Sequence, residues 1–505
     1  MNGHANQNLL CQNLIANLLV AIIVLAFVPS VNAADGVAPL PNVILIVADD
    51  MGYADMGTQG AVGFKTPHLD RLAAEGTRFT DFYVAQAVCT ASRTALMTGC
   101  YPNRLHMQGA YNHTSRDGIA DEEWLLPEMF KELGYATSAM GKWHLGTRPK
   151  FNPIRHGFDE WFGIPYSNDN SKYHPSLAKE MPPLPLYDGD KVIELDPDQA
   201  EFTKRCTERA ISFIERSADK PFFLYMPHIM PHVPIFASDA FKGRSQAGLY
   251  GDVMEELDWS VGEVLATLKR LKLDDSTLVI FISDNGPFLS YGEHAGSAKP
   301  LREGKLTTFE GGVRVPCIAR WPGRVPAGRV CATPFMGIDL LPTMTELVGG
   351  KTPTLKIDGR SAKGVLLGAE DAKPPHEALF FYSGTALQAV RSGPWKLHFA
   401  HPYITVAGEP GRGGKPSNWG KLAPTSITQS GVEGIATRHG YRIEKIEQSL
   451  FNLEADPGET TDVAAQHPDI VATLSRLGDA IREELGDSLE GVAGSGLRAA
   501  GIDEP

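Results

Sequence analysis

Two short apolar runs in this sequence each end in a pair of oxygen-bearing side chains. The run NVILIVA precedes Asp49 and Asp50, and the run TLVIFIS precedes Asp284 and Asn285. Both runs are rich in β-branched residues, which is typical of buried strands in a largely parallel sheet. Ligands of open α/β sheets bind just beyond the carboxyl ends of such strands. Carboxylates and amides are hard oxygen donors, so the pattern predicts a Ca²⁺ site, with Mg²⁺ as the alternative.

A candidate nucleophile stands at the start of a predicted helix. Cys89 precedes the helix-compatible residues 90–98, which stop at Gly99. An anion at this position faces the unpaired N–H groups at the positive end of the helix. Arg93, one turn further along, offers a planar fork of donors to the same anion. Taken alone, Cys89 can also be interpreted as a buried structural cysteine.

Composition and charge exclude several classes of function. Of the 505 residues, 43% are hydrophobic and 21% are charged, which is close to the globular average and excludes wholesale disorder or a multi-span membrane protein. The formal net charge of -13 argues against nucleic acid or acidic membrane surfaces as partners. A small anion can still bind where a few basic side chains converge in one pocket.

The N-terminal segment predicts export. Residues 1–33 contain no Lys, Arg, Asp or Glu, and they hold an unbroken apolar run at 18–28 followed by small residues. This pattern is typical of a cleaved signal peptide, with an uncleaved N-terminal anchor as the alternative. The apolar run is shorter than the roughly 20 residues of a transmembrane helix. We therefore expect a periplasmic or secreted protein with no membrane contact after signal cleavage.

The cysteine count leaves one thiol over. Loss of the signal removes Cys11 and leaves five cysteines: Cys89, Cys100, Cys206, Cys317 and Cys331. In an oxidising compartment an odd number suggests that one thiol has another task. Setting Cys89 aside leaves four cysteines, which can pair in three ways or stay reduced.

Predicted strands and helices alternate through most of the chain. Strands are expected at 42–48, 221–226 and 277–283, and helices after Thr66-Pro67, at 202–216 and at 247–271. Such alternation favours an α/β fold. We expect a catalytic domain at 40–360, a C-terminal subdomain at 361–490 and a flexible tail at 491–505. The subdomain is predicted to hold a small antiparallel sheet with segments at 378–382 and 387–399, a Gly/Pro-rich loop at 402–431 and a helix at 468–485.

The segment that begins at Cys89 reads Cys89-Thr-Ala-Ser-Arg93 followed by Thr98-Gly-x-Tyr101-Pro102. It resembles the first signature of the sulfatase family, most closely its arylsulfatase A-like members. Residues 134–146, which contain Gly-Lys142-Trp-His144, resemble a second signature of the same family. Further similar motifs follow in chain order at 156–159, 163–167, 227–234, 283–286 and 304–312.

This resemblance implies an alkaline phosphatase-like fold, in which helices sandwich a large mixed sheet and a smaller C-terminal α+β subdomain carries an antiparallel sheet. It also implies hydrolysis of sulfate esters by formylglycine, which a formylglycine-generating maturation enzyme makes by oxidising Cys89. Two positions depart from the usual pattern. Ala91 replaces a common Pro, so the maturation enzyme that accepts this motif stays open, and Met140 replaces a smaller residue.

By the same resemblance, the geminal diol of formylglycine attacks sulfur, and its second hydroxyl later expels sulfate. Asp284 would help to deprotonate the attacking hydroxyl, and His144 would be the base of the final elimination. The remaining roles are assigned as follows: metal ligands Asp49, Asp50, Asp284, Asn285 and position 89; a cationic cradle of Arg93, Lys142 and Lys305; leaving-group donors His232 and Lys305; and candidate substrate contacts Ser167, His228 and His398.

Two other functions remain open at this stage. A phosphatase or phosphonate hydrolase of the same fold also binds a tetrahedral anion, but its usual two-metal form needs additional His and Asp ligands. A calcium-bound glycan-binding protein with an intact Cys89 thiol is the non-catalytic alternative. For a sulfatase, a sulfated glycan or an aryl sulfate is the expected substrate, because loops and the C-terminal part select the alcohol.

Overall fold

The computed structural model describes residues 40–429 and 431–504. Residues from Pro41 onward form one compact unit. The predicted signal peptide at 1–33 lies outside the described residues. Within the described part of the chain, no helix combines the length and the apolar character that crossing a bilayer requires.

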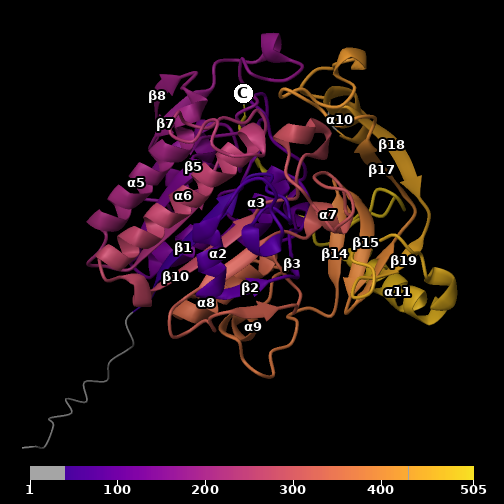
Figure 1. Cartoon of the computed structure of the whole chain (residues 1–505). Helices are drawn as coiled ribbons and strands as arrows, with labels where there is room; N and C mark the ends of the chain where they lie inside the picture. Colours follow the sequence, from indigo (N-terminus) through magenta and orange to yellow (C-terminus); the bar gives the residue numbers. More distant parts are fainter. Residues whose placement is uncertain (1–39, 430, 505) are drawn as a thin grey trace, which may run out of the picture. The chain divides into compact units, whose positions relative to one another are not determined.

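A ten-stranded mixed sheet forms the centre of this unit (Figure 1), with the strand order β12-β2-β11-β10-β1-β9-β5-β6-β7-β8. The strands are β1 (Asn42–Ala48), β2 (Thr77–Phe79), β5 (Ala136–Lys142), β6 (Glu160–Ile164), β7 (Pro185–Asp188), β8 (Lys191–Leu195), β9 (Phe222–Pro227), β10 (Thr277–Ser283), β11 (Cys317–Arg320) and β12 (Arg329–Cys331). β1 pairs in parallel with β10 on one side and β9 on the other. The three predicted strands are therefore confirmed, and the structure places them side by side at the centre of the sheet.

Helices cover both faces of the sheet because the central strands are apolar on both sides. Ile44 and Ile46 of β1 belong to the same hydrophobic cluster as residues of α2 (Pro67–Ala74), α5 (Phe202–Arg216) and α6 (Gly248–Arg270). On the opposite face, Phe130 of α4 (Leu126–Glu132) stacks on Phe223 of β9 with ring centroids 4.5 Å apart. The predicted alternation of strands and helices is confirmed as a layered α/β arrangement.

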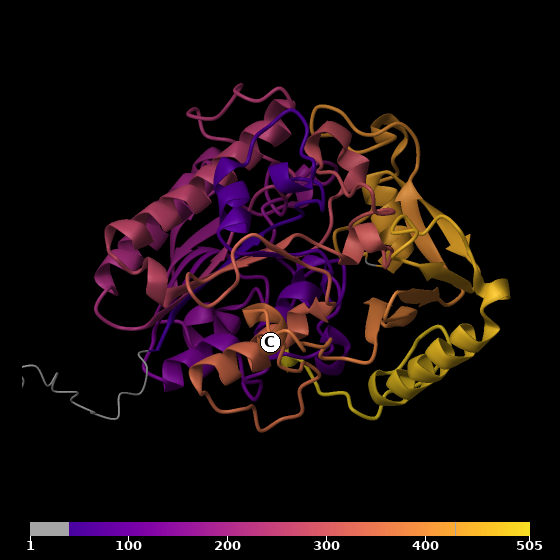
Figure 2. The same cartoon turned by 60° about the horizontal axis from the view of Figure 1, so that its bottom comes forward.

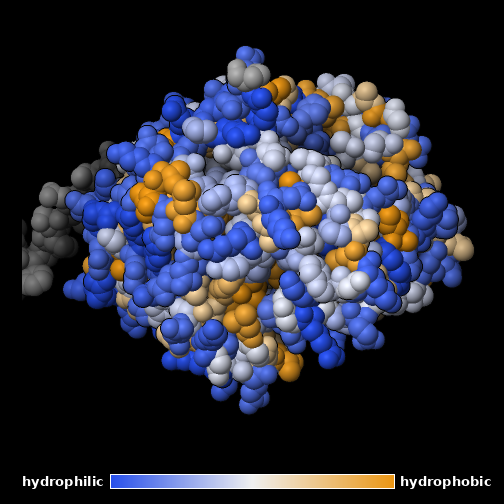
Figure 3. All heavy atoms as spheres, turned by 90° about the horizontal axis from the view of Figure 1, so that it is seen from above, coloured by the Kyte–Doolittle hydropathy of each residue, from blue (hydrophilic) through white to orange (hydrophobic). Residues whose placement is uncertain are grey.

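Further helices and small two-stranded sheets lie outside the central sheet and the C-terminal sheet. The helices are α3 (Cys89–Thr98), α7 (Glu310–Val313), α8 (Leu340–Val348), α9 (Lys363–Leu367), α10 (Gly431–His439) and α11 (Pro468–Leu485), and two-stranded sheets join β3 (Phe82–Tyr83) to β13 (Phe335–Met336) and β4 (Asp117–Gly118) to β20 (Gly501–Ile502). α8 and α9 come forward in the turned view of Figure 2. The face in Figure 3 is largely hydrophilic, with small separate hydrophobic patches, in agreement with the acidic composition.

The C-terminal region carries the predicted antiparallel sheet. Its four strands lie in the order β14-β15-β16-β19, with bounds β14 (Leu379–Ser383), β15 (Ala386–Ser392), β16 (Trp395–His398) and β19 (Ser449–Asn452). The segment predicted at 387–399 is divided into β15 and β16 by a turn at Gly393, whose φ of 55° suits glycine. The expected α/β class with a smaller α+β part bearing an antiparallel sheet is confirmed.

Two C-terminal segments differ from the sequence-based expectation. The expected loop at 402–431 includes β17 (His401–Val406), which pairs with β18 (Tyr441–Ile446) across a long sequence separation, and it is followed by α10. The expected flexible tail at 491–505 returns to the large sheet domain over its described part. There β20 pairs with β4, and Arg498 Nε lies 2.7 Å from Glu123 Oε1. In both segments, distant partners supply hydrogen bonds that local composition does not reveal.

Candidate active site

The two predicted acidic pairs meet at the carboxyl ends of β1 and β10. The register places Ala48 beside Ser283, so the residues that follow both strands are adjacent. The backbone N–H of Asp50 donates to Asp284 Oδ1 at 3.1 Å, and Asn285 Nδ2 donates to Asp50 Oδ1 at 2.7 Å. Asp50 has a φ of 67°, in the left-handed region that few non-glycine residues adopt. Such local strain is common at functional sites.

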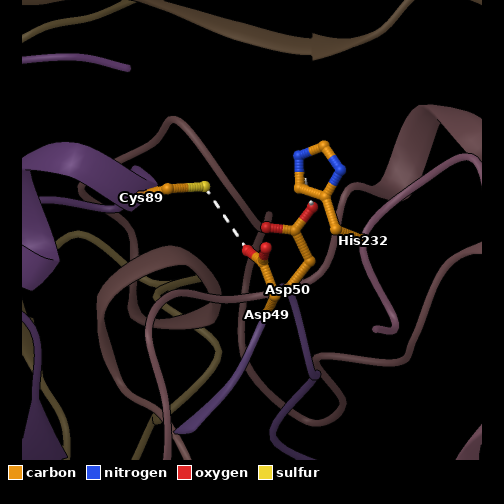
Figure 4. Close-up of side chains that lie close together, drawn as sticks. All are labelled: Asp49, Asp50, Cys89 and His232. Atoms are coloured by element: carbon orange, nitrogen blue, oxygen red, sulfur yellow. Dashed lines mark hydrogen bonds and ion pairs between the residues drawn. The ribbon is translucent and has the colours of Figure 1, made fainter. Parts of the chain in front are cut away.

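Helix α3 brings Cys89 to the same place. Cys89 is its first residue, after the extended Val88, and the helix ends at Gly99 with a φ of 70°. The helix is confirmed, and it places Cys89 at its positive end as predicted. The Cys89 thiol donates to Asp49 Oδ1 at 3.4 Å (Figure 4). Burial raises the pKa of this thiol to about 12, and the Asp49 carboxylate adds to the effect.

Three buried cations neutralise the three carboxylates. Arg93 Nη2 lies 2.8 Å from Asp284 Oδ2, and its Nε donates to the same oxygen at 3.0 Å. Lys142 Nζ and Lys305 Nζ each lie 2.6 Å from a carboxylate oxygen, of Asp49 and Asp50 respectively. The Lys305 ammonium is also 3.4 Å from Cys89 Sγ. Charges buried to this degree are tolerable only when they are paired, and here the pairs surround the thiol.

The donor set retains capacity for a metal ion. Asp50 Oδ2 and Asn285 Oδ1 are buried and have no hydrogen-bond partner among the described residues. Ligand atoms of Asp49, Asp50, Cys89 and His232 all lie within 4.8 Å of one another. Burial raises the pKa of Asp50, an effect that Lys305 opposes and Asp284 reinforces. A cation would favour the ionised carboxylates and satisfy the free oxygens, so these residues fit a metal site.

Two predicted catalytic histidines are held in defined tautomers. His144 Nε2 donates to the Tyr111 carbonyl at 2.7 Å, so Nδ1 keeps its lone pair, and it has no partner within the described chain. His232 Nδ1 donates to the Val233 carbonyl at 2.6 Å, so Nε2 keeps its lone pair and lies 3.7 Å from Asp50 Oδ2. Burial lowers the pKa of both histidines, followed by the charge of Lys142 for His144 and of Lys305 for His232. Each therefore offers one basic nitrogen.

The backbone turns sharply at His144, just beyond the end of β5. Lys142 is the last residue of β5, whereas His144 has a φ of 65°. The chain thus turns at the end of the strand, and it delivers the two side chains to the site from a bend. Both side chains are fully buried. As at Asp50, the strained conformation occurs where the strand reaches the candidate site.

A cavity of about 290 Å³ opens on Cys89. Ser167, His232 and Lys305 line it from the large sheet domain, and residues of β17 and α10 line it from the C-terminal region. Ser167 therefore borders the cavity, and its role as a substrate contact stays a prediction. The cavity therefore lies between the large sheet domain, which was predicted to supply the reacting groups, and the C-terminal region, which was predicted to help select the substrate alcohol.

Two predicted substrate contacts lie elsewhere. His228 does not line the cavity, and its ring nitrogens have no partner in the described chain. His398 is also absent from the cavity wall, and its Nε2 lies 2.8 Å from Glu459 Oε1 in a buried cluster. Lys396 and His398 alternate along β16, and both side chains belong to a buried salt-bridge cluster. A substrate contact by His398 does not fit this position.

Sequence reasoning missed other residues of the site region. Asp169, Asn170, Arg438 and His439 line the cavity. Asp169 and Asn170 follow closely after Ser167, so this proximity was a usable signal. Arg438 and His439 carried none, because α10 reaches the cavity only through the pairing of β17 with β18. Glu459 belongs to none of the predicted motifs, and the structure places its carboxylate in the interior.

Comparisons with known proteins agree with this geometry. The sulfatase family model matches residues 41–350, and a model described as the C-terminal region of aryl-sulfatase matches 374–492. The chain is 38% identical to N-acetylgalactosamine-6-sulfatase of Canis lupus familiaris over 89% of this chain and 87% of that protein. It is 39% identical to arylsulfatase A of Homo sapiens over 87% of each.

A solved structure shows the same fold. The PsFucS1 sulfatase from Pseudoalteromonas sp. superposes with a TM-score of 0.74 at 26% identity, covering 88% of this chain and 90% of that one. Fold and site together define a hydrolase with the alkaline phosphatase-like fold that acts on esters of a tetrahedral oxyanion. More narrowly, the chain belongs to the sulfatase family and is a sulfuric ester hydrolase.

Proposed function

We propose that the chain hydrolyses sulfate esters with formylglycine made from Cys89. The observation that carries this proposal is the convergence of residue 89 with Asp49, Asp50, Asp284 and Asn285 from three distant segments. In the maturation step, an external oxidant used by the maturation enzyme takes two electrons from the side chain, the C–S bond breaks and sulfur leaves as sulfide, and an oxygen atom from water or the oxidant completes the aldehyde. Hydration of the aldehyde gives the geminal diol.

The reaction has two halves. One diol hydroxyl, losing its proton towards Asp284, attacks sulfur and displaces the substrate alcohol, which takes a proton from Lys305, or from His232 once its Nε2 has been protonated. The second hydroxyl then loses its proton to Nδ1 of His144, the C–O bond to sulfate breaks, and the aldehyde returns. A thiol offers no second hydroxyl, so Cys89 without modification would end at a stable adduct.

The buried cations give the electrostatic environment for this transfer. Arg93, Lys142 and Lys305 are fixed by carboxylates within 3 Å, so they face the sulfate oxygens without reorganising during the reaction. Ser167 is placed to contact the sulfate or to orient a neighbour. Asp49, Asp50, Asp284 and Asn285 would hold one Ca²⁺ with position 89, and the ion would supply charge stabilisation. His232 is also close enough to take part.

We further propose export through the predicted signal peptide at 1–33, with a natural substrate that is a sulfated glycan. Support for the substrate comes from relatives named for N-acetylgalactosamine 6-sulfate esters. The domain limits at 40–360 and 361–490 stay predictions. Edman sequencing of protein secreted by its native host tests the cleavage site, and an intact N-terminus would contradict it.

Two measurements test the proposed mechanism. Hydrazide labelling and mass spectrometry of the peptide that carries residue 89, from protein produced in its native host, should detect the aldehyde. The purified protein should hydrolyse 4-nitrophenyl sulfate far faster than 4-nitrophenyl phosphate. An intact, alkylatable Cys89 thiol would favour a glycan-binding protein, and a wide preference for the phosphate would favour a phosphatase.

A further inference from the structure

The cavity above Cys89 contains polar side chains that the proposed reaction does not use. Asp169 and Arg438 line it, as does Gln86. Arg438 is 6% exposed, and its Nε has no hydrogen-bond partner among the described residues. Gln86 is 1% exposed, and its Oε1 has none either. An unpaired donor and an unpaired acceptor in one buried wall are costly unless a ligand satisfies them.

Two neighbouring side chains, of Asn170 and His174, orient the Asp169 carboxylate. Asn170 Nδ2 donates to its Oδ1 at 3.1 Å, and His174 Nε2 lies 3.9 Å from its Oδ2. His174 Nδ1 accepts from the backbone N–H groups of Ser176 and Leu177, so the ring proton is on Nε2 and the positive edge of the ring faces the carboxylate. The carboxylate is thereby oriented and keeps acceptor capacity towards the cavity.

Arg438 comes from the C-terminal region and is anchored at its far end. Its Nη1 donates to the backbone carbonyls of Ser426 and Gln429, which leaves Nε directed elsewhere. Arg438 and Asp169 line the same cavity. Burial lowers the pKa of Arg438, and the Asp169 carboxylate opposes that change. A guanidinium and a carboxylate in one cavity wall offer donors and acceptors to the same ligand.

The rest of the wall is apolar. Phe288, Ile404 and Ile435 line the same cavity. A volume of about 290 Å³ is at the lower end of the roughly 300–1,000 Å³ that ligand pockets span, which suits one ring with its sulfate. A sugar ring has hydroxyl groups at its edge and C–H groups on its faces, so it matches both parts of this wall. The ring of a simple aryl sulfate has no such hydroxyl groups.

We propose that Asp169 and Arg438 bind the hydroxyl groups of a single sulfated sugar ring and so make the enzyme prefer sugar sulfates to aryl sulfates. This inference rests on the proposed function, because it assumes that the sulfate lies at residue 89. Asp169 and Arg438 act as specificity-determining residues, and the C-terminal helix α10 thereby takes part in substrate selection.

The test compares kcat/KM for two kinds of substrate in the full-length, matured enzyme. The aryl substrate is 4-nitrophenyl sulfate, and the sugar substrate is the fastest among monosulfates of galactose, N-acetylgalactosamine and N-acetylglucosamine. In Asp169→Asn and Arg438→Lys, the ratio of sugar to aryl kcat/KM should fall by at least about tenfold, because a charged hydrogen-bond partner is lost or displaced. The matched surface variants Asp190→Asn and Arg442→Lys should keep the wild-type ratio.

The ratio separates substrate selection from a structural role, because a structural defect lowers turnover of both substrates together. Thermal unfolding identifies any variant that fails to fold, and the other variant then decides. A ratio that falls by less than tenfold overturns the inference, as does a wild-type enzyme that hydrolyses the aryl sulfate but none of the sugar sulfates. Absence of both activities in wild-type protein carrying formylglycine would instead contradict the proposed function.

Discussion

Two buried charge clusters lie within this protein, and they differ in how completely their side-chain oxygens are hydrogen-bonded. The catalytic cluster comprises Asp49, Asp50, Arg93, Lys142, Asp284, Asn285 and Lys305. The interface cluster comprises Glu310, Lys396, His398 and Glu459, and it joins α7 to the C-terminal sheet. Lys396 Nζ lies 2.9 Å from Glu310 Oε1 and 3.0 Å from Glu459 Oε1.

The carboxylates of the interface cluster are fully paired. Glu310 Oε2 accepts from the Tyr83 hydroxyl at 2.6 Å, and Glu459 Oε2 accepts from the Glu310 backbone N–H at 2.6 Å. In the catalytic cluster, Asp50 Oδ2 and Asn285 Oδ1 have no partner in the described structure. Burial of charged side chains therefore does not by itself mark a catalytic centre. Free acceptors next to a cavity distinguish the functional cluster from the structural one.

The largest expected effect is on the catalytic cluster. Cys89→Ala should lower kcat for 4-nitrophenyl sulfate by about 10³-fold or more, because the nucleophile is lost, while the protein still folds. Steady-state kinetics measure the loss of kcat, and hydrazide labelling should detect no aldehyde at residue 89 of this variant. Cys206→Ala, at another buried cysteine in α5, is the control and should retain activity. Substantial turnover by Cys89→Ala would contradict a covalent role for residue 89.

The next effect belongs to the interface cluster. Lys396→Met should lower the free energy of unfolding by about 3–5 kcal/mol, because it removes the cation that the buried carboxylates of Glu310 and Glu459 share. Glu310 keeps Arg314 at 3.4 Å, so the loss falls mainly on Glu459. Chemical denaturation measures the change, and kcat of the folded enzyme should change little. Lys421→Met removes an exposed lysine and serves as the control. Adding Glu459→Gln to Lys396→Met should recover part of the loss, and no recovery would mean that the pair is not coupled.

A smaller effect tests the free acceptors. Ca²⁺ at one hundred times its Kd should stabilise the native protein by about 2.7 kcal/mol, which thermal unfolding detects as a higher Tm. Asp50→Asn should remove this shift, because the amide is a weaker ligand, and Asn also tolerates the left-handed backbone at this position. The exposed variant Asp190→Asn should retain the shift. An equal shift in Asp50→Asn would place the metal elsewhere.

The last effect is a pH dependence of the interface cluster. Burial raises the pKa of Glu459 to about 7, although Lys396 opposes this change. The folded state therefore binds this proton more tightly than the unfolded state, and its contribution to stability is lost as pH rises from the ordinary Glu value of about 4.5 through about 7. Glu459→Gln should flatten this part of the curve of unfolding free energy against pH. The same slope in Glu459→Gln and wild type would assign it to other groups.

Much of the candidate site could be predicted from sequence because its residues stand next to strongly patterned elements. Asp49, Asp50, Asp284 and Asn285 follow apolar strands, and Cys89 begins a helix that ends at Gly99. Strand and helix patterns are local, and parallel strands bring their carboxyl ends to one edge of the sheet. These facts determined the class of fold and the convergence of the acidic pairs.

Only the tertiary structure decided which side chains face the cavity. His398 and Glu459 pair with each other across 61 positions, and Arg438 reaches the cavity because β18 pairs with β17. The same alternating pattern in β16 could have faced a pocket or a core, since period-two alternation defines a face but not what covers it. Whether a face borders a cavity or the core depends on packing between segments far apart in the chain. That packing leaves the catalytic cluster beside a cavity and buries the interface cluster between α7 and the C-terminal sheet.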